Sequence, residues 1–142
     1  MNYVIVRNSV ADEIHEKFVD GSIQWAGEVG PGWLYVSGVF VEPEPTIDDV
    51  KAECLRRRKV LMGLTASSST KDLDYKRSLG VEEAVALQDI RLEGGTWSSE
   101  QTARALILRQ TRSALKLTLD KSNALQTMNP IPSNFQEDTW WS

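Results

Sequence analysis

The stretch VEPEPTIDDV, residues 41–50, divides the chain into a β part and a helical part. Its two alternating prolines exclude a helix interior and a central strand, and they favour an extended, semi-rigid spacer. Thr46 can then cap a helix whose first turn carries acidic side chains, where the helix dipole favours them. The sequence therefore predicts a small β module at residues 1–41, a proline-rich linker at 42–45 and a helical region at 46–129.

Upstream of the linker, the sequence is typical of short strands. Four runs rich in β-branched and aromatic residues are separated by turn signals, and they cover residues 3–6, 22–25, 33–36 and 38–41. Ser37-Gly38 between the last two runs indicates a two-residue hairpin. The alternation in WLYVSGVFV is too weak to show which face is buried. We expect a small antiparallel β-meander, which needs a partner layer because short sheets are marginal alone.

Downstream of the linker, apolar periodicity predicts a helical hairpin or three-helix region. The helices are expected from Thr46 to Met62 or Gly63, from Leu73 to Leu92 with a weak point at Gly80, and from about Ser99 to Thr127. Ser98 and Gln101 form a capping box at the start of the third helix.

Apolar residues at helical spacing are the expected inner faces of these helices. They are Ile47, Val50, Cys54, Leu61 and Leu64 in the first, Leu79, Ala84, Leu87 and Ile90 in the second, and Ala103, Leu106, Ile107, Ala114, Leu117, Ala124 and Met128 in the third. Gln110 and Lys121 interrupt the third stripe, which suggests a face partly open to water.

The last segment, residues 130–142, is expected to be an extended tail, because Pro130 and Pro132 end the third helix. Trp140 and Trp141 each bury on the order of 200 Å² when packed, so they are costly to leave in water. We expect them to pack either on the chain's own helices or on another chain. The predicted fold class is therefore α+β, with an N-terminal β-meander, a helical region and an aromatic tail.

Composition fits a soluble protein of one compact domain, or of a small module tied to a helical one. Of the 142 residues, 41% are hydrophobic and 25% charged, and no apolar run approaches the roughly 20 residues of a membrane helix. A signal peptide is not expected, because the first residues have no basic segment and no cleavage site. The single Cys54 excludes an internal disulfide and is expected to be a half-buried helix residue, with a bridge to a neighbouring subunit as the alternative.

Charge is uneven along the chain. Residues 1–50 hold nine acidic and two basic side chains, a net charge of −7, whereas residues 51–142 hold eleven acidic and fourteen basic ones, a net charge of +3. This asymmetry fits either solvated surfaces or head-to-tail contact between copies.

The sequence offers no set of residues for catalysis, a cofactor or a metal. One histidine, His15, and one cysteine cannot assemble a familiar zinc site, and no phosphate-binding loop or nucleophile motif is present. The basic run at residues 56–59 fits a helix end better than a nucleic-acid site, because a pI near 5.0 opposes counterion release at phosphates. The aromatic residues of the β part indicate either a sheet core or a sugar-stacking surface: Trp25, Trp33, Tyr35 and Phe40.

Three stretches of the chain resemble small tail-associated proteins of tailed bacteriophages and prophages, a group that includes virion structural and tail fibre assembly proteins. They are MNYVIVRN leading to VGPGWLYVSGVFVEPEP, then TIDDVKAECLRRRK, and finally GGTWSSEQTARALILRQ with SNALQTMNPIPSNFQEDTWW. The resemblance covers about half of the chain and extends over its full length.

The resemblance implies a non-enzymatic protein of the virion tail, assembled in the host cytoplasm and bound to tail, baseplate or fibre proteins. It further implies a homo-oligomer within the particle, without nucleic-acid or membrane partners. Alternatives are a tail fibre assembly chaperone and a host-surface carbohydrate-binding module. The candidate partner-binding residues are aromatic: Trp33, Tyr35, Phe135, Trp140 and Trp141.

Overall fold

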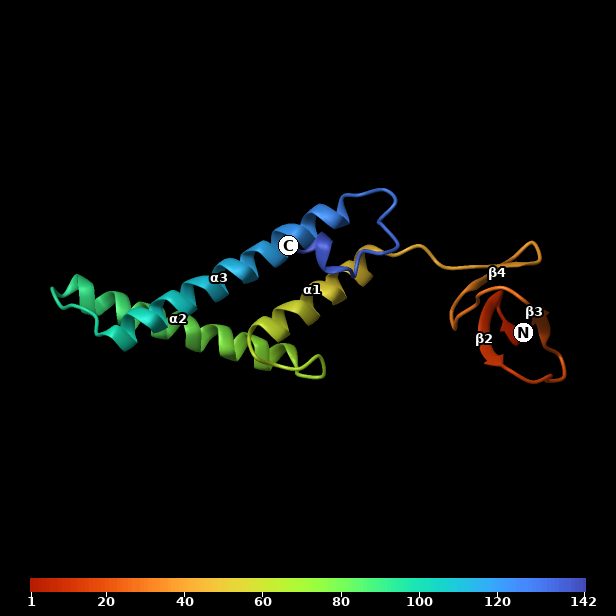
Figure 1. The fold of residues 1–142 in the computed structure, drawn as a ribbon, viewed down its shortest axis with the longest axis horizontal. Coiled ribbons are helices and arrows are strands. Elements are labelled where there is room, and N and C mark those ends of the chain that lie inside the picture. The colour runs from red at the N-terminus through yellow and green to blue at the C-terminus, as the bar shows by residue number, and fades with distance from the viewer. The chain divides into compact units, whose positions relative to one another are not determined.

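The computed structural model describes all 142 residues as two compact units, Met1–Glu44 and Pro45–Ser142. The first is a curled antiparallel sheet of five strands, and the second contains three helices (Figure 1). The predicted α+β class and the order of its parts are confirmed.

The sheet has the strand order β3-β1-β2-β4-β5. Its strands are β1 (Asn2–Arg7), β2 (Val10–His15), β3 (Ile23–Trp25), β4 (Leu34–Val36) and β5 (Val39–Val41). Four of them match the predicted runs. Strand β2 was missed because its sequence, VADEIH, contains two exposed acids and no aromatic residue. It follows β1 through Asn8 and Ser9, which both take positive φ angles, as a tight hairpin turn requires.

One face of the sheet forms the core of the β unit around Val4, Ala11 and Phe40. The ring of Phe40 meets Trp25 edge-on, with 5.3 Å between centroids, and lies 4.8 Å from the ring of Tyr35. Aromatic residues thus supply the partner layer that a sheet of short strands lacks.

The β4–β5 hairpin is apolar on both faces. Its turn residues Ser37 and Gly38 have φ angles of 52° and 84°, which confirms the predicted two-residue turn. Tyr35 and Phe40 pair across the strands on the inner face. The opposite face carries four aliphatic side chains, between 40% and 50% exposed, which we call the outer hairpin face: Leu34, Val36, Val39 and Val41. Two apolar faces leave no alternation, so the buried face could not be predicted.

Each helix of the second unit begins with a capping box. The helices are α1 (Ile47–Leu61), α2 (Thr70–Leu92) and α3 (Ser99–Gln126), and their caps are Thr46, Ser69 and Ser98. Such caps stabilise a helix start by about 0.5–2 kcal/mol each. Helix α2 begins three residues earlier than predicted, because Ser69 and Asp72 bond each other's backbone N–H groups. It also runs unbroken through Gly80.

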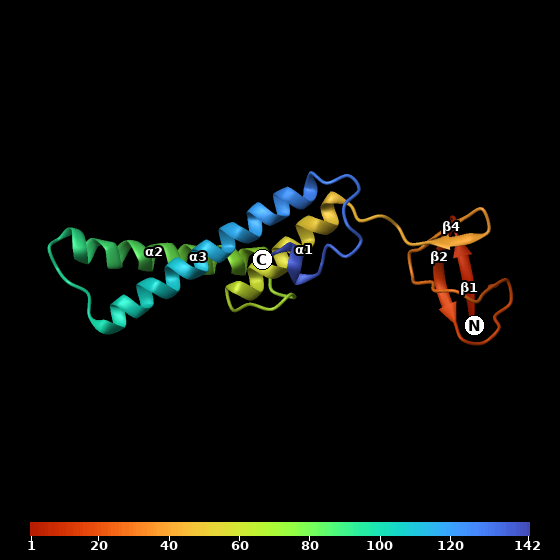
Figure 2. The ribbon, with the colours of Figure 1, turned by 45° about the horizontal axis from the view of Figure 1, so that its top comes forward.

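Helix α3 extends along α1 and continues past α2, as two views of the unit show (Figures 1 and 2). Val50 and Cys54 of α1 pack against Leu125 of α3 in a buried cluster. Cys54 is only 5% exposed, so its thiol is not presented to a neighbouring subunit.

The predicted inner faces of all three helices are partly wrong. In α1, Ile47 is 47% and Leu61 is 41% exposed. Leu79 is 46% exposed, and Leu106 and Ile107 are 55% and 50% exposed, whereas Leu73 and Thr118 are buried. Helices α2 and α3 carry apolar residues on more than one side, and packing within one chain covers only one of them.

The tail is folded back rather than extended. Residues 130–142 form turns and a short 3-10 helix, η1 (Asp138–Trp140), and they return along α1 and α3 (Figure 1). Ile131, Phe135 and Trp141 are buried in the cluster around Val50. Local backbone bonds satisfy the turns, which lets large apolar side chains reach the helices. Trp141 therefore packs on the chain's own helices.

Candidate functional site

The five aromatic residues proposed from sequence do not form one site. Trp33 and Tyr35 are half-buried and pack against the β core. Phe135 and Trp141 are buried in the helical core, so partner binding through these two side chains stays a prediction from the sequence. Trp140 is half-buried at the edge of that core.

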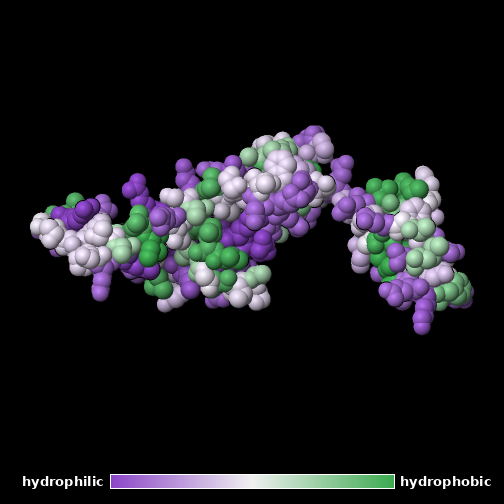
Figure 3. Space-filling view, viewed as in Figure 1, coloured by the Kyte–Doolittle hydropathy of each residue, from purple (hydrophilic) through white to green (hydrophobic).

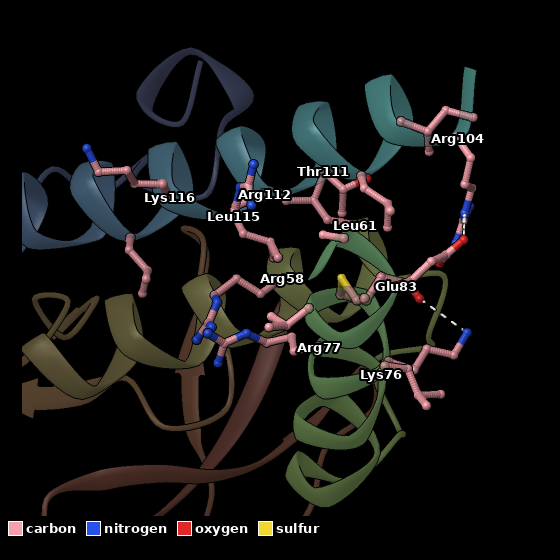
Figure 4. Close-up of a pocket in the computed structure, with 18 residues that line it drawn as sticks. Arg58, Leu61, Lys76, Arg77, Glu83, Arg104, Thr111, Arg112, Leu115 and Lys116 are labelled. Atoms are coloured by element: carbon pink, nitrogen blue, oxygen red, sulfur yellow. Dashed lines mark hydrogen bonds and ion pairs between the residues drawn. The ribbon is translucent and has the colours of Figure 1, made fainter. Parts of the chain in front are cut away.

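The helical unit has a groove of about 600 Å³ lined by α1, α2 and α3. We call it the helical groove; Figure 4 shows it in close-up. Its volume lies within the roughly 300–1,000 Å³ of ordinary ligand sites. Aliphatic side chains that are 39–60% exposed line it: Leu61 of α1, Leu79 and Val81 of α2, and Ile107 and Leu119 of α3.

Charged residues of the helical groove are almost all basic. The lining contains one acid, Glu83, and six cations: Arg58, Lys76, Arg77, Arg104, Arg112 and Lys116. Arg104 donates Nε and Nη2 to the two carboxylate oxygens of Glu83 at 2.6 and 2.8 Å. These hydrogen bonds lower the pKa of Glu83. Five cations are left without a carboxylate partner.

Arg58 is the cation whose environment is least satisfied. Its Nε atom is buried and has no hydrogen-bond partner. In the view of Figure 4 the side chains of Arg58 and Arg77, which both line the groove, end beside one another. A buried donor without an acceptor costs about 1–3 kcal/mol, and neighbouring like charges repel. A carboxylate entering between the two guanidinium groups would relieve both effects.

The four residues of the basic run at 56–59 have different surroundings, because they lie on different sides of α1. Arg56 and Arg57 both bond the carboxylate of Glu53, with Nε–O distances of 2.8 and 2.9 Å. The ammonium group of Lys59 lies 3.5 Å from the carbonyl oxygen of Ala66. Only Arg58 lines the groove. The sequence interpretation as a charged helix end therefore missed this residue.

Exposed apolar surface on the helical unit is extensive and adjoins charge. Figure 3 shows green, apolar residues gathered over the middle of the unit next to purple, hydrophilic ones. A second hollow of about 580 Å³ lies between α2 and α3 and shares Ala84, Leu108 and Arg112 with the helical groove. At its edge Trp97 donates Nε1 to the carbonyl of Leu87 at 2.7 Å, with Arg91 over its ring. Apolar surface of this extent is typical of a protein-binding site.

The helical groove offers hydrophobic contact and positive charge to a ligand. It therefore suits an apolar surface bordered by carboxylates. No group of three or more histidine, cysteine, aspartate or glutamate side chains is arranged to hold a metal ion. None of the helices has the length and hydropathy required to cross a bilayer. In comparisons with known proteins, the chain matches no family model, no curated protein and no solved structure.

Proposed function

We propose that the chain is a non-enzymatic structural protein of a bacteriophage tail, which attaches to tail, baseplate or fibre components in the virion. The observation that supports this most directly is exposed aliphatic surface on both units, at the outer hairpin face and at the helical groove. A proline-rich link separates the two surfaces in sequence. A protein with two such surfaces can hold two partners at once.

The resemblance of three stretches to phage tail-associated proteins supplies the biological context. It favours attachment in the particle over an isolated binding role. The aromatic residues of the sheet are used for its core, so the attachment surfaces are aliphatic: the outer hairpin face and the walls of the helical groove.

The proposal is tested by quantitative mass spectrometry of particles purified from the strain that carries the gene. A structural component is expected at a fixed copy number relative to the tail proteins. Absence from the particles, or a copy number far below that of any tail protein, would contradict it.

Surface variants test the attachment surfaces better than a deletion does. Removing residues 130–142 takes Phe135 and Trp141 out of the helical core, so loss of incorporation would report unfolding. Val39→Glu on the outer hairpin face is expected to reduce incorporation. Gln24→Glu adds the same charge at an exposed position of β3 and should leave it unchanged.

A tail fibre assembly chaperone is the second candidate. The open, apolar helical groove favours it, because a chaperone needs a surface that covers a client and later releases it. The same mass spectrometry separates the two candidates. A chaperone is expected in infected cells bound to a fibre protein and missing from purified particles.

A further inference from the structure

The outer hairpin face is an apolar surface that nothing in its own unit covers. Leu34 pairs with Val41 and Val36 with Val39 across the two strands, and each side chain is at least 40% exposed. Strand β5 is also the edge of the sheet, so one row of its backbone N–H and C=O groups has no strand partner. Edge strands that carry apolar side chains are places where another chain docks.

Acidic residues border this face. Glu42 and Glu44 directly follow β5, and both are exposed and make no ion pair within their unit. The unit Met1–Glu44 holds seven acidic and two basic side chains, a net charge of −5. The outer hairpin face is thus a small aliphatic surface within an acidic module.

The helical groove has the opposite character. Its walls expose aliphatic side chains, and its lining carries six cations and one acid, a net charge of +5. The buried Nε of Arg58 lacks an acceptor of the kind that Glu42 and Glu44 provide. Apolar contact would supply the affinity, and opposite charge would favour this partner over others.

We propose that the outer hairpin face of one copy binds the helical groove of a second copy. Glutamates that follow β5 then lie near the cations of the groove that have no carboxylate partner, Arg58 and Arg77 among them. The charge and exposure of these surfaces favour this contact whichever phage component the protein meets.

This contact joins two different surfaces, so it is heterologous. Each copy that offers its hairpin leaves its own groove free for the next copy, and the assembly grows as a ring or an open row. A single groove and one hairpin form a small interface, so the contact is expected to be weak and reversible. Salt should weaken it further, because it screens the charges that the two surfaces contribute.

The experiment is sedimentation velocity of the full chain across the micromolar range, at low and high salt. The wild type is expected to form species larger than a dimer as concentration rises, with less association at high salt. A wild type that stays monomeric at every concentration would overturn the proposal.

Two single variants separate the surfaces. Val39→Glu places a carboxylate on the outer hairpin face and leaves the helical groove intact. Leu79→Glu places a carboxylate in the groove wall and leaves the outer hairpin face intact. Glutamate is a good helix former and Leu79 is exposed, so this change preserves α2. Each variant alone is expected to be monomeric, whereas their mixture should form a 1:1 heterodimer and nothing larger, because one intact groove then meets one intact hairpin.

The controls are matched in chemistry and location. Val85→Glu removes an exposed aliphatic residue of α2 outside both hollows, and Gln24→Glu adds an acid to β3. Both should associate as the wild type does. If Val39→Glu abolishes association and Leu79→Glu does not, hairpins pair with each other and the proposal is wrong.

Circular dichroism checks the fold of each variant. If Leu79→Glu lowers the helical signal, Arg112→Glu replaces it, because Arg112 is an exposed groove cation on α3. A folded groove variant that still associates as strongly as the wild type contradicts the proposal. The virion measurement has a separate outcome, since a protein that never self-associates can still be a stoichiometric tail component.

Discussion

The guanidinium group of Arg57 lies over the ring of Trp141, 5.1 Å from its centroid. Arg57 belongs to α1, and Trp141 follows η1 at the far end of the chain. The same guanidinium donates to the backbone carbonyl of Gln136 at 2.8 Å and to Asp138 at 2.9 Å, while Nε bonds Glu53. One side chain thus ties the tail to the first helix.

Replacing Arg57 with alanine should destabilise the helical unit. The change removes the contact with the Trp141 ring and the hydrogen bonds to the tail, and it deprives the buried Glu53 of one cation. We expect the free energy of unfolding to fall by about 2–3 kcal/mol, measured by urea denaturation followed by the helical circular dichroism signal. Arg56→Ala is the comparison, because Arg56 also bonds Glu53 but makes no hydrogen bond to the tail, so its cost should be smaller than that of Arg57→Ala. Equal losses in the two variants would show that Arg57 does not hold the tail.

Stability of the helical unit should depend on pH through Glu53. Hydrogen bonds from Arg56, opposed by burial and supported by the charges of Arg56 and Arg57, hold the pKa of Glu53 below its ordinary value of 4.5. A carboxylate with a lowered pKa in the folded state stabilises fully above the unfolded pKa, and this contribution is lost as pH falls through the folded pKa. Glu53→Gln should therefore be less stable than the wild type near neutral pH, and the gap should narrow as pH falls below 4.5.

Urea denaturation of Glu53→Gln and the wild type at a series of pH values measures that gap. Glu82 is an exposed acid of α2 that makes no ion pair, so Glu82→Gln serves as the control and should track the wild type throughout. A gap at Glu53 that stays constant down to pH 3 would rule out the ionic origin of its effect.

The two adjacent tryptophans should differ in their importance for stability. Trp141 is 5% exposed and donates Nε1 to the carbonyl of Phe135 at 2.7 Å. Trp141→Ala leaves a cavity and an unpaired carbonyl, so it should cost about 3–5 kcal/mol in chemical denaturation. Trp140 is only half-buried, with its Nε1 bonded to Asn134, and Trp140→Ala should cost less than half as much. The reverse order would mean that the tail packs through Trp140.

Gly80 and Gly94 should respond to alanine with opposite signs. A Cβ at Gly80 meets only the Cδ2 of Leu108, at 3.9 Å, so alanine fits inside α2 and should raise stability by about 0.5–1 kcal/mol. Gly94 follows the end of the same helix with a φ of 86°, a conformation in which alanine is strained. Gly94→Ala should therefore lower the stability of the protein by about 1 kcal/mol. Thermal unfolding measures both, and a destabilising Gly80→Ala would indicate that the helical groove needs the flexibility of glycine.

Local chemistry explains which parts of the fold were predictable. The Ser37-Gly38 turn and the caps at Thr46 and Ser98 depend on neighbours in sequence, and the structure has each where it was expected. Strand β2 depends on pairing with β1 along its whole length, which its own acidic sequence does not reveal.

The groove could not be predicted because it depends on packing between helices distant in sequence. Apolar periodicity identified Leu106 and Ile107 as amphipathic positions, but it could not tell a face that packs within the chain from one left exposed. Arg58 lines the groove, whereas its neighbours Arg56 and Arg57 bond Glu53 and the tail. That difference likewise depends on where Glu53 and the tail lie in the fold.

The return of the tail to α1 has a consequence for how the protein is made. Val50 leaves the ribosome about ninety residues before Trp141, yet the two belong to one buried cluster. Helix α1 can form as it emerges from the ribosome, but its apolar side remains exposed to solvent until residue 141 has been synthesised. Closure of this core is thus a late, long-range event, and during translation α1 exposes Val50 and Cys54 to any chaperone or nascent neighbour nearby.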